Sequence, residues 1–158
     1  MATAVALNST ILYGAAWTGT APGPANPTVS GTITSTTDFS DHLQSSDVGI
    51  AVAKVDFTNF GSGGFTEAKT GLIDLTFSLN LFQDFAASSI DSVFGAAVLN
   101  RTLVYLDIKP TNAARSATNP SIVAALYVMT YPVSYAVGSG VMTKVDFMSG
   151  GKFARLTS

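Results

Sequence analysis

The chain has 158 residues and no cysteine, so it is the usual size of one domain and offers no disulfide, thiolate zinc site or cysteine nucleophile. Apolar residues make up 47% of the chain and charged residues 11%, against about 25% charged residues in an ordinary soluble domain. The formal net charge is −2, and the eight basic residues are scattered singly, which disfavours tight nucleic-acid binding.

This combination of high apolar content and few charges requires a cause. No window approaches the ~18 apolar residues of a membrane-spanning helix, so no membrane partner is expected. Residues 1–5 lack the basic flank and apolar core of a signal peptide, so we expect the chain to be made and kept in a cytoplasm. Weakly charged, apolar surfaces are typical of chains that neighbouring subunits cover, which favours self-assembly.

The first third of the chain predicts two strands separated by a long loop. Apolar and polar residues alternate over residues 5–13, which indicates a strand. The alternation stops from Gly14 to Thr28, where prolines and glycines predict a loop of a length that is usually functional. A threonine-rich strand is predicted from Val29 to Thr37, followed by a turn over residues 38–41.

The middle of the chain carries the clearest strand signal. Residues 50–60 alternate until the glycine run at residues 61–64 breaks the pattern, which predicts a hairpin tip or a strand break. In the next strand one face is apolar and the other is polar, which predicts a core face of Leu75, Phe77, Leu79 and Leu81 and an opposite face of Asp74, Thr76, Ser78 and Asn80.

After Asp84 the apolar spacing becomes helical, and it predicts one short helix over residues 90–98. Ser88 and Asp91 resemble a capping box at its start. Further strands are predicted at 101–109, 122–131 and 141–147, with Gly150-Gly151 releasing a short segment over residues 150–158.

Together these patterns predict a single domain over residues 1–158 with about seven strands and one helix. The order of the elements shows no alternation of strands and helices. We therefore expect a mainly β fold with one flanking helix, an antiparallel β-sandwich or barrel.

The polar residues give little support for catalysis or cofactor binding. His42 is the only histidine, and no nucleophile elbow accompanies it. The glycine run at residues 61–64 lacks the Lys-Ser or Lys-Thr of a phosphate-binding loop, and the ten carboxylates show no calcium-loop spacing. We expect no enzyme activity, no cofactor and no metal. Trp17 either folds back onto the domain or anchors a partner, and its pattern does not decide between them.

Several segments resemble one family. Residues 55–65, Val-Asp-Phe-Thr-Asn-Phe-Gly-Ser-Gly-Gly-Phe, followed by Gly-Leu-Ile-Asp at 71–74, are similar to the middle of the major tail tube proteins of long-tailed, siphovirus-type phages, especially those of actinobacteria. Residues 82–91 resemble the segment that precedes that family's single helix. Residues 109–111 and 117–120 resemble the strand and loop that follow it, and residues 150–158 resemble its C-terminus.

The resemblance implies a β-sandwich subunit in hexameric rings that stack into the tail tube, through which genomic DNA passes without specific binding. It implies further partners in the tail terminator and tail-tip proteins, location in the virion tail, and assembly in the host cytoplasm. On this interpretation the candidates for lining the lumen are Asp74, Thr76, Ser78 and Asn80. The loop from Gly14 to Thr28 is the candidate for contacts between subunits or rings, with Trp17 as its anchor. The individual candidates are Trp17, Pro22, Pro24, Phe60 and Phe65.

Two other functions remain open on the sequence. A carbohydrate-binding β-sandwich module would use Trp17, Tyr13 and Tyr135 to stack on sugars, and it would stay monomeric. A capsid decoration or connector protein would assemble into particles of a different shape.

Overall fold

The computed structural model describes residues 9–22, 29–58, 61, 63, 65–135 and 140–157. In these ranges a 3-10 turn (Ser40–His42) precedes β5, and a π-helical turn (Asp91–Gly95) leads directly into α1 (Ala96–Asn100). The strands are β1 (Thr10–Gly14), β2 (Ala16–Thr18), β3 (Thr32–Thr34), β4 (Thr37–Asp38), β5 (Leu43–Asp56), β6 (Ala68–Phe82), β7 (Leu103–Lys109), β8 (Ser121–Thr130), β9 (Val133–Ser134) and β10 (Met142–Leu156).

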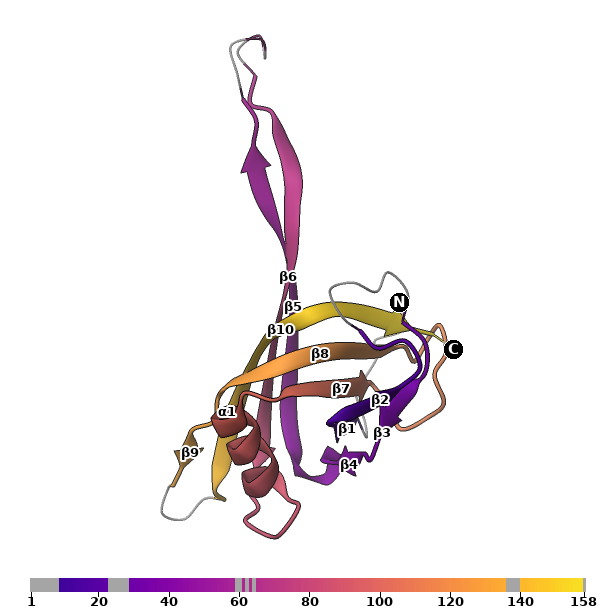
Figure 1. The fold of residues 1–158 in the computed structure, drawn as a ribbon, viewed down its shortest axis with the longest axis vertical. Helices are drawn as coiled ribbons and strands as arrows, with labels where there is room; N and C mark the ends of the chain where they lie inside the picture. The colour runs from indigo at the N-terminus through magenta and orange to yellow at the C-terminus, as the bar shows by residue number, and fades with distance from the viewer. Residues whose placement is uncertain are drawn as a thin grey trace.

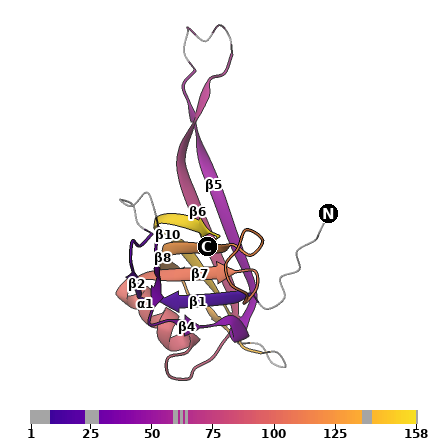
Figure 2. The ribbon, with the colours of Figure 1, turned by 90° about the vertical axis from the view of Figure 1, so that its right-hand side faces the viewer.

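Eight of these strands form one antiparallel sheet. Its order is β4-β1-β7-β8-β10-β6-β5, with β9 paired beside β10, while β2 and β3 form a separate ribbon. Both views show β5 and β6 running across the direction of β7 and β8, so the sheet is strongly twisted (Figures 1 and 2). The predicted mainly β, antiparallel fold with one flanking helix is confirmed.

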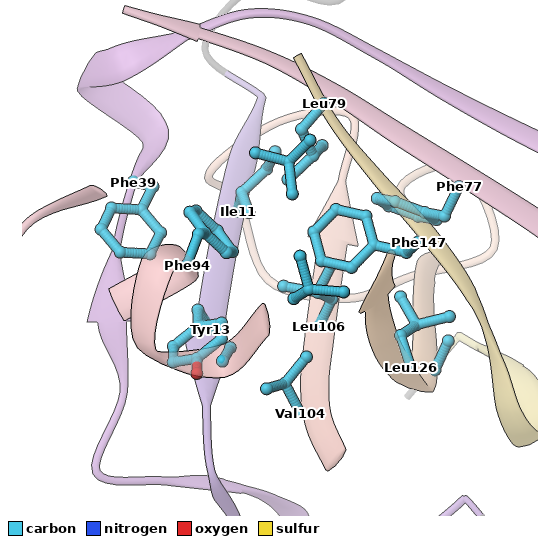
Figure 3. Close-up of a cluster of buried hydrophobic side chains, with 14 of the residues drawn as sticks. Ile11, Tyr13, Phe39, Phe77, Leu79, Phe94, Val104, Leu106, Leu126 and Phe147 are labelled. Carbon is cyan, nitrogen blue, oxygen red and sulfur yellow. The ribbon is translucent and has the colours of Figure 1, made fainter. Parts of the chain in front are cut away.

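The core lies on one face of this twisted sheet, where α1 and the turn before it cover it. The predicted core face of β6 is confirmed, because Leu75, Phe77, Leu79 and Leu81 are all buried. Side chains from β1, β7, β8 and β10 meet them (Figure 3), among them Ile11, Leu106, Leu126 and Phe147.

Phe94 closes the core from the helical side. Its side chain is fully buried, and its ring centroid lies 5.5 Å from that of Tyr13, 5.3 Å from that of Phe39 and 5.9 Å from that of Phe147. Tilted and edge-on aromatic pairs at such distances add to the free energy of burial. One residue of the helical segment therefore joins the N-terminal strands to β10.

The predicted capping box at the helix start is wrong. Ser88 has a left-handed φ of 61°, and the helical segment begins at Asp91 with no side-chain cap. The Asp91 carboxylate instead accepts hydrogen bonds from the Tyr131 hydroxyl, at 3.0 Å, and from Gln83 Nε2, at 3.4 Å. A tertiary contact thus replaces the local one.

Three predicted boundaries also differ. The loop expected over residues 14–28 contains β2, which pairs with β3, and the strand expected over residues 29–37 is divided into β3 and β4, with Ser35 at a φ of 53° between them. Gly150 does not end a strand but lies inside β10. A Cβ atom there would be 2.4 Å from Leu103 Cδ1, so the glycine allows β10 to pass close to β7 side chains.

We expect Phe94→Ala to lower the free energy of unfolding by about 3–5 kcal/mol, because it removes a fully buried ring and leaves a cavity. Urea denaturation of the monomer measures this change. Leu99→Ala on the same helix is the control, since Leu99 is 83% exposed and its loss should change stability by less than about 0.5 kcal/mol. Equal effects of the two substitutions would contradict this account of the core.

Candidate functional site

The face of the sheet opposite the core is open over β5, β6 and β10. The predicted polar residues Asp74, Thr76, Ser78 and Asn80 all lie on this side of β6, and each is at least partly exposed. The pairing register places Ser78 between Asp47 of β5 and Asp146 of β10. We call this surface the open face. It contains a shallow depression of about 470 Å³, whose lining includes Asp47, Thr76, Ser78 and Asp146 together with Val48, Gly49, Phe77 and Phe147.

Around Ser78 the described side chains of the open face include three carboxylates and one lysine. Lys144 Nζ lies 3.4 Å from Asp146 Oδ1, and Thr130 Oγ1 donates a hydrogen bond of 3.0 Å to Asp146 Oδ2. Asp47 and Asp74 add two further negative charges on the same side of the neighbouring strands. The surface that faces outward here is polar and net acidic.

Sequence reasoning did not find Asp47 and Asp146. They are far from residues 74–80 along the chain and reach the open face only through strand pairing. Lys144 and Asp146 alternate with the buried Val145 and Phe147. This period-two alternation is the sequence signal that could have placed Asp146 on the face opposite the core.

A two-stranded arm extends from the sheet. β10 pairs with β6 only from Phe82 to Thr76, whereas β5 and β6 remain paired as far as Asp56 and Ala68. Both views show this hairpin projecting well beyond the body (Figures 1 and 2). We use the word arm for the described residues between Ile50 and Asp74.

The apolar row of the core continues into the arm without a cover. On the core side of β6 the next position after Leu75 is Ile73. On β5, Ile50 pairs with Leu75 and Val52 pairs with Ile73. Leu75 is buried, but Ile50 is 53% exposed, Val52 50% and Ile73 62%. Three β-branched side chains thus extend a hydrophobic face into solvent.

Local contacts shape the outer part of the arm. Gly71 allows β5 to lie close to β6, because a Cβ at this position would lie 2.9 Å from Val55 Cγ2. Near the tip the Thr58 hydroxyl and amide donate to Asp56 at 2.5 and 2.8 Å, and these hydrogen bonds lower the pKa of the Asp56 carboxyl. Lys69 Nζ lies 5.2 Å from the centre of the Phe57 ring, a cation–π contact.

β5 is the edge of the eight-stranded sheet. Within the described ranges, no strand pairs with its outer side from Leu43 to Asp56. A long edge strand with unpaired backbone groups is a ready site for pairing with another chain.

The predicted contact residues lie in different settings. Trp17 packs on its own domain, with its ring 5.6 Å from that of Tyr105 and its Nε1 donating a hydrogen bond of 2.9 Å to Ser30 O. Pro22 is buried, and Phe65 is 78% exposed beside the arm tip. Pro24 and Phe60 lie outside the described residues.

The segment before the helix is held by polar contacts. The Ala86 amide donates to Asp84 Oδ1 at 2.9 Å, which lowers the pKa of Asp84, and His42 Nε2 lies 3.5 Å from Asp84 Oδ2. Gln83 Nε2 donates to the Tyr131 hydroxyl at 2.5 Å. Partial burial, together with the neighbouring Asp91 carboxylate, raises the pKa of Tyr131 from 10.0 to about 12.

Among the described residues, no three His, Cys, Asp or Glu side chains are grouped as metal ligands would be. The described part of the chain also has no helix of the length and apolarity needed to cross a membrane. Of the aromatic side chains considered for sugar stacking, Tyr13 is buried against Phe39 and Phe94, so it has no open ring face to offer a glycan.

No protein-family model and no curated protein sequence matches the chain. Among solved structures, a chain from the virion of a native gene transfer agent particle matches with a TM-score of 0.58 and 11% identity, over 73% of this chain and 85% of that one. A chain from the tail of an empty gene transfer agent particle, with C6 symmetry, has a TM-score of 0.59 and 11% identity over 73% and 82%.

A chain of the SPP1 tail tube covers still more of the molecule. It matches 96% of this chain and 77% of its own length, with a TM-score of 0.60 and 9% identity. The chain therefore has the fold of tail tube proteins. The structures that it resembles include the gene transfer agent tail and the SPP1 tail tube.

The contacts of Tyr131 predict an alkaline loss of stability. Because its pKa is about 12 in the fold and lies near 10 when unfolded, its contribution is fully present below pH 10 and is lost as the pH rises towards 12. Tyr131→Phe should remove this part of the pH dependence. Unfolding free energies measured from pH 8 to 12 check it, and identical alkaline slopes in the two proteins would show that the assignment is wrong.

Proposed function

We propose that this chain is a major tail tube subunit of a siphovirus-type, actinobacteriophage-like phage. Copies form hexameric rings, the rings stack, and the resulting tube conducts DNA during ejection. Its role is structural rather than catalytic, and the whole of residues 1–158 acts as one domain. The tail tube fold and the C6 symmetry of one similar tail support this proposal.

The observation that carries the proposal is the uncovered apolar row of the arm. Ile50, Val52 and Ile73 are each at least half exposed in the isolated chain. Covering the exposed part of such a side chain contributes on the order of 1 kcal/mol. The row therefore favours association, and copies of the same chain are the partner that a tube supplies.

The edge strand β5 supports closure into a ring. When a sheet edge pairs with a neighbouring subunit, its backbone N–H and C=O groups form hydrogen bonds. If the subunits close into a ring, every such edge is paired. β5 offers such an edge over the whole of Leu43–Asp56. We propose that it joins the sheets of adjacent subunits into an inner β-barrel.

The open face is our candidate for the wall of the channel. Asp74, Thr76, Ser78 and Asn80 lie there, together with Asp47 and Asp146. Phosphates are repelled by carboxylates, so DNA would pass such a wall without binding. An excess of acidic over basic side chains suits a wall that lets DNA pass better than a wall that binds DNA.

The contact residues proposed from the sequence keep their roles here. Phe65 is the most favourably placed, since it is exposed beside the arm tip. Trp17 would act from β2, while Pro22, which is buried after that strand, Pro24 and Phe60 complete the proposed set. Tail terminator and tail-tip proteins are the further proposed partners, in a tail assembled in the host cytoplasm.

Negative-stain electron microscopy over a concentration series tests the assembly. We expect hollow tubes or stacked rings whose hole admits a DNA duplex. Ile50→Thr with Ile73→Thr should leave the monomer folded, because both side chains are largely exposed, but should raise the concentration needed for assembly about tenfold. Monomers that bind glycans, or solid particles without a channel, would overturn the proposal in favour of a carbohydrate-binding module or a decoration protein.

Charge reversal on the open face tests the channel wall. Tubes carrying Asp47→Lys and Asp146→Lys should retain short duplex DNA in a form protected from nuclease, and the retention should fall with added salt. Wild-type tubes should retain none. Asn112→Lys with Thr118→Lys adds lysines on an exposed loop away from this face, and equal protection by that control would refute the assignment.

A further inference from the structure

A second apolar surface lies where α1 meets β8. It is an open hollow of about 510 Å³ lined by Val98, Arg101, Tyr127, Val128, Met129 and Met148. Met129 is 52% exposed and Met148 47%. Methionine side chains adapt their shape to an inserted group, so such a surface suits an apolar side chain from another molecule.

Arg101 stands at the rim of this hollow in a costly conformation. It ends α1 with a left-handed backbone, φ 51° and ψ 41°, where glycine is the usual residue because it has no Cβ. The side chain is exposed, and no ion pair of Arg101 occurs among the described residues. Local energetics favour glycine at this position, which points to a use for the guanidinium group outside the subunit.

The arm carries a matching pair of side chains. Leu72 is 86% exposed, and Asp74, two residues further along β6, is also exposed. Residues two apart on a strand project to the same side, about 7 Å from each other. The strand therefore presents one apolar and one acidic group together, and the hollow presents an apolar floor with one basic group at its rim.

The positions of the two surfaces in the sheet also fit each other. β8, which supplies Tyr127, Val128 and Met129 to the hollow, is separated from β6 by β10 in the sheet order, and Met148 of β10 pairs with Thr76 of β6. The arm and the hollow are different surfaces of one subunit, so a contact between them on two copies is heterologous and closes into a ring when the rotation allows.

We propose that the hollow of Val98, Arg101, Tyr127, Met129 and Met148 receives the arm of a second copy of this chain, with Leu72 inserted and Asp74 paired with Arg101. This inference rests on the proposed function and names the two surfaces that meet in it. It assigns Asp74 to the contact between copies, so the channel wall would consist of the remaining residues of the open face. Arg101 contributes specificity, because only an arm in the correct register brings a carboxylate to the rim.

The absence of cysteine permits a direct test. Two tagged chains, one with Leu72→Cys and one with Met129→Cys, are mixed under assembly conditions and oxidised. We expect a disulfide-linked heterodimer as the main product, at least tenfold above a control pair of Leu72→Cys and Asn112→Cys. Equal yields from the two pairs would overturn the proposal.

Arg101→Gly separates assembly from folding. The substitution relieves the left-handed strain, so the melting temperature of the monomer should rise, while the concentration needed for assembly should increase about tenfold. Arg155→Gly removes the same charge from the exposed side of β10 and should leave assembly unchanged. Unchanged assembly of Arg101→Gly would refute the role of this residue. Reversing the pair, with Arg101→Asp and Asp74→Arg together, should restore assembly that either change alone weakens.

Failure of this inference and failure of the proposed function give different results. Hollow tubes that form without the Leu72–Met129 cross-link would support the tube function and refute the contact between the arm and the hollow. The cross-link in particles that have no channel would support the contact between the arm and the hollow and refute the tube function.

Discussion

The period-two alternation of β6 is the constraint on which the rest of the structure depends. Its odd-numbered residues from Leu75 to Leu81 are buried, and its even-numbered residues from Asp74 to Asn80 face outward. A shift of one residue in pairing would exchange the two faces, so the core fixes the register strongly. That register then sets which β5 and β10 side chains share the open face. Core and surface are therefore specified by one strand.

The parts that could be predicted from the sequence are those governed by local periodicity. The alternation of β6 is enough to identify its core face, and the helical spacing around Phe94 is enough to identify the single helix. The remaining features depend on contacts between distant residues. The row of Asp47, Ser78 and Asp146 needs the pairing of three strands, and the continuation of β10 through Gly150 needs the close approach of Leu103.

The composition follows from the distribution of uncovered surfaces. In a monomer the row of Ile50, Val52 and Ile73 and the hollow beside Met129 expose apolar groups that a soluble domain ordinarily replaces with charged ones. In the proposed assembly neighbouring copies would cover both surfaces, and the few charges that remain would select the register. On that proposal the low charge content and the exposed arm have the same cause, which is dependence on neighbouring copies.

The place of β10 in the sheet has a consequence for synthesis on the ribosome. β10 is the strand that joins β8 to β6, and among the described residues it is the last strand in chain order. The β5–β6 hairpin can form from consecutive residues while translation continues, but the two halves of the sheet cannot unite until β10 has emerged. A nascent or prematurely terminated chain lacks a complete open face. If the proposed tube forms, incomplete polypeptides would therefore lack the surface that lines its channel.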